Sequence, residues 1–117
     1  MIKAKRLVKS FQHAWHGLVK VAKEEQNFRV ELGVAIVVMI MALMFRVSRL
    51  ELVILILVSG LVLIMEIINS AVEAISDALK PKLDIYVKQI KDMVSAGVMM
   101  AAITAAIIGI IIFSQYI

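Results

Sequence analysis

The stretch that decides the fold is LVILILVSGLVLIMEIINSAVEAISD, residues 52–77. From Leu52 to Met65 it is uncharged and almost wholly apolar, as expected of a helix that crosses a membrane. Its second part carries acids and an amide where such a helix should be finishing. Lys80 and Pro81 follow, and a proline disfavours helical geometry at the residue before it. We therefore predict a transmembrane helix over residues 51–79.

The polar residues of this stretch share one face of the predicted helix. On a helical wheel they fall within an arc of about 100°. They are Glu66, Asn69, Ser70, Glu73 and Asp77. One acid near the centre of a span costs roughly 2.5–3.5 kcal/mol, so this face must meet protein, metal or water rather than lipid. It either pairs with other helices to hold a bundle together or forms a functional site, and acids inside spans favour the second interpretation.

The rest of the chain predicts two more spans and a surface helix. The 117 residues are 62% hydrophobic, well above the share of a soluble domain. We expect a surface helix over 3–24, a first span over 29–48, a polar connection over 80–92 and a third span over 92–115. The predicted fold is a single all-α integral membrane domain, residues 1–117, with three transmembrane helices and an N-terminal amphipathic interfacial helix.

The distribution of charge predicts the orientation of the spans and the surface that the chain meets. The net charge is +4, and Lys and Arg concentrate before the first span and in the 80–92 connection. Both segments are therefore expected in the cytoplasm and the C-terminus outside. Because the basic residues flank apolar segments, an anionic membrane surface is the expected partner and nucleic acid is not.

Three segments bring polar groups to the same predicted membrane depth as the acidic face. The first span enters with Glu25, Asn27, Arg29 and Glu31, and the third with Lys91, Asp92 and Ser95. Carboxylates without histidine or cysteine suit a hard cation such as Mg²⁺, which fills its shell with water and phosphate oxygens. A nearby lysine neutralises phosphate charge. We expect phosphoryl transfer from a soluble nucleotide to a lipid hydroxyl, without a glycine-rich phosphate loop.

Three motifs, one on each span, carry a resemblance to a known family. They are EEQNFRVE (24–31), EIINSAVEAISD (66–77) and KDMVSAGVMMAAI (91–103). In this order they resemble the small prokaryotic integral-membrane lipid kinases, which comprise diacylglycerol kinase and undecaprenol kinase. The resemblance covers nearly the whole chain and implies an ATP-dependent kinase that works as a homotrimer with sites shared between subunits.

The resemblance also implies roles for individual residues. Glu66 would be the catalytic base, and Glu25 and Glu73 would bind Mg²⁺ together with ATP. The other nucleotide contacts would be Arg6, His13, Lys91 and Asp92. The lipid site would be lined by Trp15, Asn27, Phe28, Arg29, Glu31, Glu66, Asn69 and Ser95, with Asn69 ordering the catalytic carboxylate.

The lipid and the class of protein leave alternatives. The turn SRLE (48–51) and the ending AAITAAIIGIIIF (101–113) look closer to the Gram-positive branch, which favours undecaprenol as substrate, with diacylglycerol as the alternative. A small proton-coupled transporter would place its key acid near the midplane, reachable from both sides. A non-catalytic subunit would leave the shared face of Glu66, Asn69 and Glu73 without a purpose.

Two further features have structural interpretations beside functional ones. Gly97, Ala101, Ala105 and Gly109 recur every four residues on the third span, which predicts close helix packing within or between subunits. Trp15 fits an anchor at the membrane interface better than a substrate contact.

Overall fold

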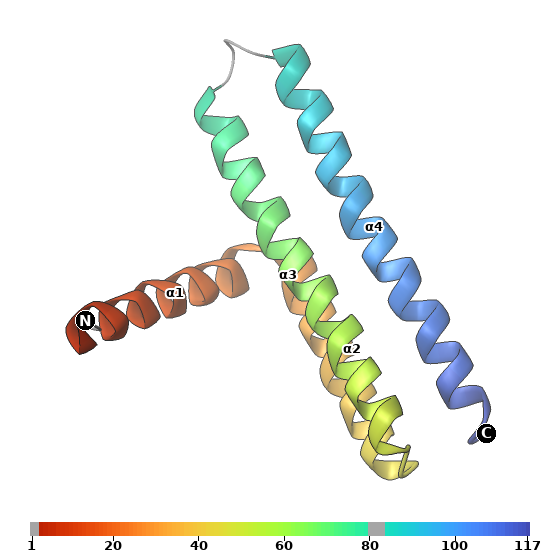
Figure 1. Ribbon diagram of the computed structural model, residues 1–117. Helices are drawn as coiled ribbons and strands as arrows, with labels where there is room; N and C mark the ends of the chain where they lie inside the picture. Colours follow the sequence, from red (N-terminus) through yellow and green to blue (C-terminus); the bar gives the residue numbers. More distant parts are fainter. Residues whose placement is uncertain (1–2, 80–83) are drawn as a thin grey trace.

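The computed structural model describes residues 3–79 and 84–117. It contains the helices α1 (Ala4–Glu24), α2 (Gln26–Met44), α3 (Arg49–Leu79) and α4 (Asp84–Ser114). As Figure 1 shows, α3 and α4 run antiparallel along each other, α2 packs beside α3, and α1 projects sideways from the bundle. Three of the helices are long and apolar enough to cross a membrane. The predicted fold class, three spans and an N-terminal helix, is confirmed.

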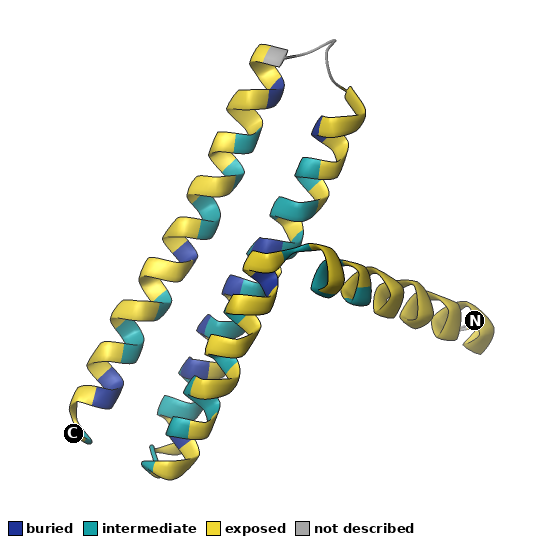
Figure 2. Ribbon diagram, turned by 180° about the vertical axis from the view of Figure 1, so that it is seen from behind, coloured by how far each residue is buried: buried dark blue, intermediate teal, exposed yellow. Residues whose placement is uncertain are grey.

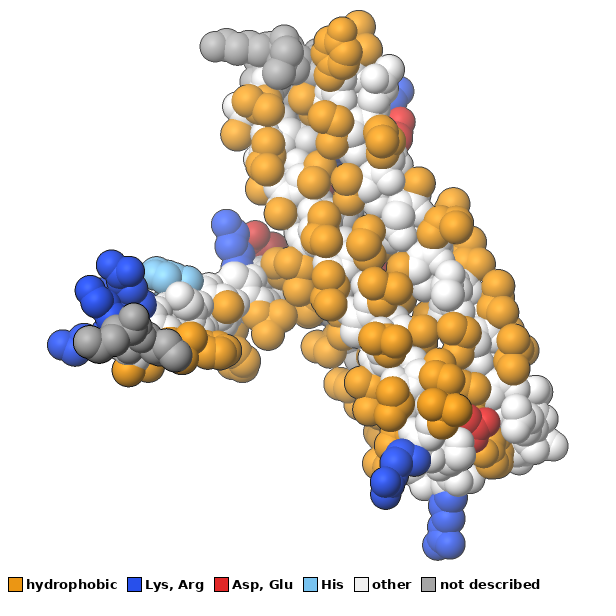
Figure 3. Space-filling view, viewed as in Figure 1, with side chains coloured by type: hydrophobic (Ala, Val, Ile, Leu, Met, Phe, Trp, Pro, Cys, Tyr) orange, Lys and Arg blue, Asp and Glu red, His pale blue; other side chains and the backbone are white. Residues whose placement is uncertain are grey.

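Most large apolar side chains of the spans face outward. They are coloured as exposed in Figure 2 and form a nearly continuous hydrophobic surface in Figure 3. A soluble protein rarely exposes an apolar surface of this extent, so these side chains meet lipid or other subunits. On α1, the Lys, Arg and His side chains gather on one side and the hydrophobic ones on the other.

The first span ends four residues earlier than the predicted boundary at Ser48, because two capping motifs divide the segment. Helix α2 ends at Met44, where the N–H of Val47 donates to the carbonyl of Ala42 at 3.2 Å, and Arg46 adopts a left-handed φ of 53°. This is a Schellman ending in which arginine occupies the position that glycine favours. It satisfies carbonyl groups that the end of the helix would otherwise leave without donors.

A capping box starts α3 directly after this turn. The N–H of Ser48 donates to the Glu51 carboxylate at 2.9 Å, and the N–H of Glu51 donates to the Ser48 hydroxyl at 3.2 Å. The two residues thus satisfy each other's backbone donors, a pattern that fixes a helix N-terminus. The loop between α2 and α3 is therefore only residues 45–48, and most of the SRLE stretch (48–51) belongs to α3.

The helix that contains the third span begins before the predicted start of that span at residue 92. Helix α4 starts at Asp84, so residues 84–92 of the expected polar connection are helical. The segment DIYVKQIKD lacks glycine and proline, and Val87 is buried, so tertiary packing extends the helix outward from the membrane span. Residues 80–83 of that connection lie outside the described residues.

The packed core lies where α2 ends, α3 begins and α4 ends. Its buried members are Ala42, Leu55, Ile112 and Phe113. The ring of Phe45 lies 6.0 Å from that of Phe113 and 6.3 Å from that of Tyr116. The Tyr116 hydroxyl donates a hydrogen bond to the Glu51 carboxylate, and this bond raises the pKa of the Tyr116 phenol. We call this region, residues 42–55 and 112–116, the turn end.

Candidate active site

The acidic face of α3 is buried most deeply at Glu66. This side chain is 2% exposed, while Asn69 and Glu73 are half-buried and Asp77 is exposed. The Ser70 hydroxyl does not join the carboxylates, because it donates back to the carbonyl of Glu66 at 3.0 Å. A buried carboxyl group is costly unless neighbouring groups or a ligand compensate for it. The least accessible position of the acidic face is therefore occupied by a carboxyl group, whose burial costs the most free energy.

Carboxyl groups from three segments meet around Glu66. Glu31 from α2 and Asn69 lie within side-chain hydrogen-bonding reach of it, and the charges of Glu25 and Glu73 act on it. We call Glu25, Glu31, Glu66, Asn69 and Glu73 the carboxylate cluster. Glu25 is the single residue between α1 and α2, so this junction, α2 and α3 all contribute to one cluster.

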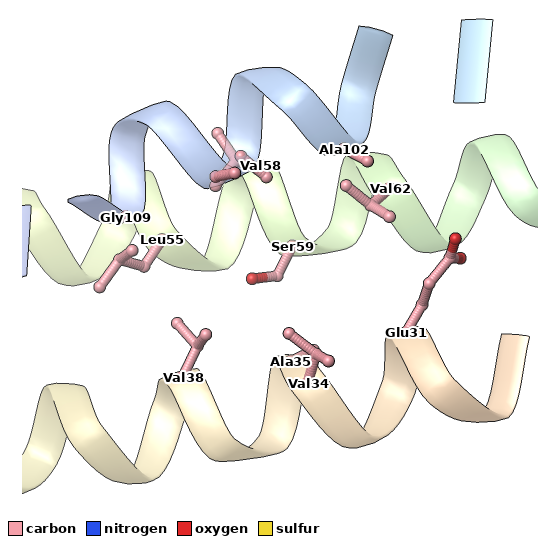
Figure 4. Close-up of a pocket in the computed structure, with 12 residues that line it drawn as sticks. Glu31, Val34, Ala35, Val38, Leu55, Val58, Ser59, Val62, Ala102 and Gly109 are labelled. Atoms are coloured by element: carbon pink, nitrogen blue, oxygen red, sulfur yellow. The ribbon is translucent and has the colours of Figure 1, made fainter. Parts of the chain in front are cut away.

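A cavity of about 290 Å³ extends from Glu31 between α2, α3 and α4. Figure 4 shows Glu31 at one end, with Val38, Leu55 and Gly109 toward the other. The remaining lining residues are Val34, Ala35, Val58, Ser59, Val62, Ala102, Ala105 and Ala106. Apart from the Glu31 carboxylate and the Ser59 hydroxyl, the walls are apolar. The shape and chemistry suit a hydrocarbon chain with a polar group at the Glu31 end.

One oxygen of Glu31 has no partner among residues 3–79 and 84–117. Its Oε2 atom is buried and receives no hydrogen bond. Buried acceptors are normally paired, so an unpaired one in a cavity wall indicates a donor that arrives with a ligand. A lipid hydroxyl is such a donor.

The small residues predicted to form a packing stripe on α4 separate into two pairs. Gly97 brings α4 so close to α3 that an added Cβ would lie 2.7 Å from the Met65 methyl carbon, and Ala101 is buried. Ala105 and Gly109 instead line the cavity, and a Cβ on Gly109 would meet no atom within 4 Å. Only the first pair supports close packing within the subunit.

Six other predicted site residues lie on α1 and on the N-terminal part of α4. Arg6 and His13 are exposed on the projecting α1, and Trp15 lines a separate shallow hollow on the same helix. On α4, Lys91 is half-buried, and Asp92 and Ser95 are exposed. None of these six residues is among the groups that act on Glu66 within this subunit.

Three predicted lipid-site residues in the first turns of α2 have different surroundings. Phe28 is buried, Asn27 is exposed, and Arg29 donates hydrogen bonds to carbonyl groups of α1. None of the three lines the cavity. The sequence analysis did not predict the cavity residues between Val34 and Val38 or between Leu55 and Val62. A run of apolar residues looks the same in the sequence whether it lines a cavity or faces lipid.

The donors near Glu66 fit a hard cation by their chemistry. Within residues 3–79 and 84–117, however, no three histidine, cysteine, aspartate or glutamate side chains are close enough to hold a metal ion alone. At nucleotide sites, Mg²⁺ is usually bound by one or two carboxylates, and water and phosphate oxygens complete its coordination shell. Glu25 and Glu73 are compatible with this partial set.

Comparison with known proteins gives consistent matches. Residues 12–113 match the family model described as prokaryotic diacylglycerol kinase. The chain is 32% identical over 108 residues to the undecaprenol kinase of Bacillus subtilis, covering 92% of this chain and 88% of that one. It is 37% identical over 103 residues to the diacylglycerol kinase of Escherichia coli K12, covering 87% and 84%. A Synechocystis diacylglycerol kinase is 31% identical over 107 residues, covering 91% of this chain and 61% of that one.

Proposed function

The chain belongs to the prokaryotic diacylglycerol kinase family and is an ATP-dependent membrane lipid kinase, and we propose that its lipid is undecaprenol, which it converts to undecaprenyl phosphate. Diacylglycerol, giving phosphatidic acid, is the alternative. The named relatives act on both alcohols at similar identity, so the proposal depends on the site of this chain.

The observation that carries the proposal is the cavity that begins at the unpaired oxygen of Glu31 beside Glu66. Undecaprenol has one primary hydroxyl at the end of one hydrocarbon chain. An apolar cavity of about 290 Å³ with its carboxylate at one end suits a single chain with a terminal hydroxyl, whereas diacylglycerol brings two acyl chains on one glycerol. Valine, alanine and glycine walls leave room for the methyl branches of an isoprenoid chain.

The transfer follows from the positions of the carboxyl groups. The lipid hydroxyl donates to Glu31 Oε2, which holds its oxygen beside Glu66. As that oxygen bonds to the γ-phosphorus of ATP, the bond from this phosphorus to the β–γ bridging oxygen breaks and ADP leaves. For transfer the hydroxyl turns from Glu31 to Glu66, and its proton passes to the Glu66 carboxylate, which Asn69 orients. Burial of Glu66 keeps water, the competing acceptor, away from the reacting atoms.

Glu25 and Glu73 would hold Mg²⁺, whose chemistry is to neutralise the phosphate charge that develops during transfer. Arg6, His13, Lys91 and Asp92 would contact ATP, and Trp15, Asn27, Phe28 and Ser95 would surround the lipid head. Within one subunit none of the predicted ATP contacts on α1 and α4 acts on Glu66, which supports a homotrimer with sites completed by neighbouring subunits.

The membrane arrangement follows from charge. Helix α1 would lie on the anionic surface with its lysines toward lipid phosphates and its exposed apolar face, which includes Phe11 and Trp15, in the bilayer. The N-terminus and the α3–α4 connection would be cytoplasmic and the C-terminus outside, so that the cluster meets cytosolic ATP. The transporter hypothesis has no support, since the named relatives are kinases.

The test compares the two alcohols directly. Purified protein in detergent micelles receives radiolabelled ATP, Mg²⁺ and equal mole fractions of undecaprenol or diacylglycerol, and the initial rates of lipid phosphorylation are measured. We expect the higher kcat/KM on undecaprenol. A higher value on diacylglycerol would reverse the choice of substrate, and no product with either lipid would remove the kinase proposal for the isolated chain.

A further inference from the structure

The junction between α1 and α2 is a sharp elbow that its own sequence does not explain. Only Glu25 separates the two helices, with φ −106° and ψ 109°, an extended conformation. The surrounding sequence, KVAKEEQNFRV, contains neither glycine nor proline and consists largely of residues that a helix accepts. A continuous helix through Glu25 is therefore the local alternative, and something outside the local backbone must favour the elbow.

The elbow leaves two carbonyl groups of α1 without their helical donors. In a continuous helix, the carbonyls of Ala22 and Lys23 would accept from the N–H groups of residues 26 and 27. Breaking the helix at Glu25 removes both bonds, since only the N–H of Glu25 still donates, to Val21 at 2.8 Å. Unpaired carbonyls at a helix C-terminus also concentrate its negative partial charge.

Arg29 replaces both missing donors. Its Nη1 atom donates to the carbonyl of Ala22 at 2.9 Å and to that of Lys23 at 2.7 Å. The guanidinium therefore reaches back from the second turn of α2 to cap the end of α1, where a positive charge is favourable. Hydrogen bonds from a charged donor are stronger than neutral ones, so this contact favours the elbow over the continuous helix.

The elbow in turn determines where Glu25 stands. Glu25 acts electrostatically on Glu66, although it belongs to neither span. If α1 and α2 joined into one helix, the Glu25 backbone would turn with them and its carboxylate would change direction relative to Glu66. We propose that Arg29 is a positioning residue that caps α1, holds the elbow and thereby keeps Glu25 at the carboxylate cluster. This assigns Arg29 a role other than the lipid contact that the family resemblance implies.

Only the predicted change in kcat rests on the proposed kinase function. The first test therefore measures the conformation of the elbow directly. The chain contains no cysteine, so spin labels can be attached at Gln12→Cys on α1 and Ile40→Cys on α2, both exposed. A continuous helix would separate these positions by about 42 Å, and the elbow brings them closer. Labelled chains are diluted into unlabelled chains, so that pulsed electron spin resonance reports distances within one subunit.

The expected result is a shorter distance in the parent chain and a second population near the continuous-helix distance in Arg29→Gln. Arg29→Lys, which keeps a charged donor, should retain most of the short population. An Arg29→Gln distribution identical to that of the parent would overturn the proposal, whatever the activity.

A rescue variant separates positioning from lipid contact. Gln26 is the first residue of α2 and is exposed, and proline is well accepted at that position. Gln26→Pro cannot donate to Ala22 and forces an extended conformation on Glu25, so it favours the elbow without Arg29. Alone it should change activity little. In Arg29→Gln it should restore the short distance and most of the lost kcat.

The kinetic pattern completes the test. We expect Arg29→Gln to lower kcat about tenfold with little change in KM for the lipid, a pattern that reports a lost interaction in the transition state. In the Glu25→Gln background it should cost much less, because the two residues act in series. A raised lipid KM that Gln26→Pro does not restore would instead establish Arg29 as a lipid contact and contradict the proposal.

Discussion

The turn end and the carboxylate cluster differ in whether their polar groups find hydrogen-bond partners within the chain. At the turn end, Ser48, Glu51 and Tyr116 satisfy one another next to a packed aromatic core. At the cluster, carboxyl groups face one another and Glu31 keeps a buried oxygen without a donor. Both regions use an acid on α3, yet Glu51 is paired within the chain while Glu66 has other acids as neighbours. The difference indicates that one end stabilises the fold and the other is shaped for ligands.

The largest expected effect is the loss of activity when the acid of the cluster is neutralised. Glu66→Gln keeps the size of the side chain but cannot accept the hydroxyl proton, so kcat should fall by about 10²–10⁴. The matched control is Glu51→Gln at the turn end, which should lower the thermal midpoint but leave kcat within a factor of two or so. Lipid phosphorylation and thermal unfolding in the same detergent measure both. Comparable activity losses in the two variants would break the distinction between the regions.

The second effect is on stability at the turn end. Ile112 is 5% exposed and lies outside the cavity lining, so Ile112→Ala should leave a void and cost about 2–4 kcal/mol of folding free energy. Unfolding in mixed micelles measures this change, and kcat below the midpoint should be unchanged. If Ile112→Ala lowered kcat without lowering stability, the turn end would have a role in catalysis, and its assignment as a purely structural region would be wrong.

The third effect tests the cavity as the lipid site. Gly109→Leu places a side chain in the open space of the cavity wall, and we expect the KM for undecaprenol to rise about tenfold, equivalent to about 1.4 kcal/mol. Gly33→Leu is the control, since Gly33 is also unobstructed but exposed and outside the cavity. Equal KM values for the two variants would show that the lipid chain lies elsewhere.

The smallest effect concerns the hydrogen bond of Tyr116. Tyr116→Phe keeps the ring against Phe45 but removes the donor to Glu51, so the thermal midpoint should fall by less than half the shift of Ile112→Ala. Activity should be unchanged. A shift larger than that of Ile112→Ala would mean that this hydrogen bond, rather than apolar packing, dominates the turn end.

The sequence predicted the spans and the acidic face of α3 because apolar blocks and a polar stripe follow directly from helical periodicity. It misplaced the end of the first span, although Ser48 and Glu51 already stood at capping-box spacing. The start of α4 was missed because packing of Val87 extends a helix that the polar composition of the segment conceals.

The cavity was not predicted. A break between the surface helix (3–24) and the first span (29–48) was predicted, but its extended conformation at Glu25 and the residue that stabilises it were not. Ala105 and Gly109 suggested close packing, and only the positions of three helices show that they leave space instead. No glycine or proline marks the elbow at Glu25 in the sequence. The Arg29 side chain, four residues later, stabilises it instead. The meeting of Glu31 with Glu66 was expected only as a shared membrane depth, and the structure makes it a contact.

The most direct test of the central claim locates the lipid hydroxyl in the site. An undecaprenol analogue carrying a diazirine beside its hydroxyl is photoactivated in the presence of the protein, and the adduct is mapped by mass spectrometry. The account predicts labelling of Glu31 and its neighbours on α2 and α3, suppressed by excess undecaprenol. Labelling confined to residues 45–50 at the turn end would contradict it.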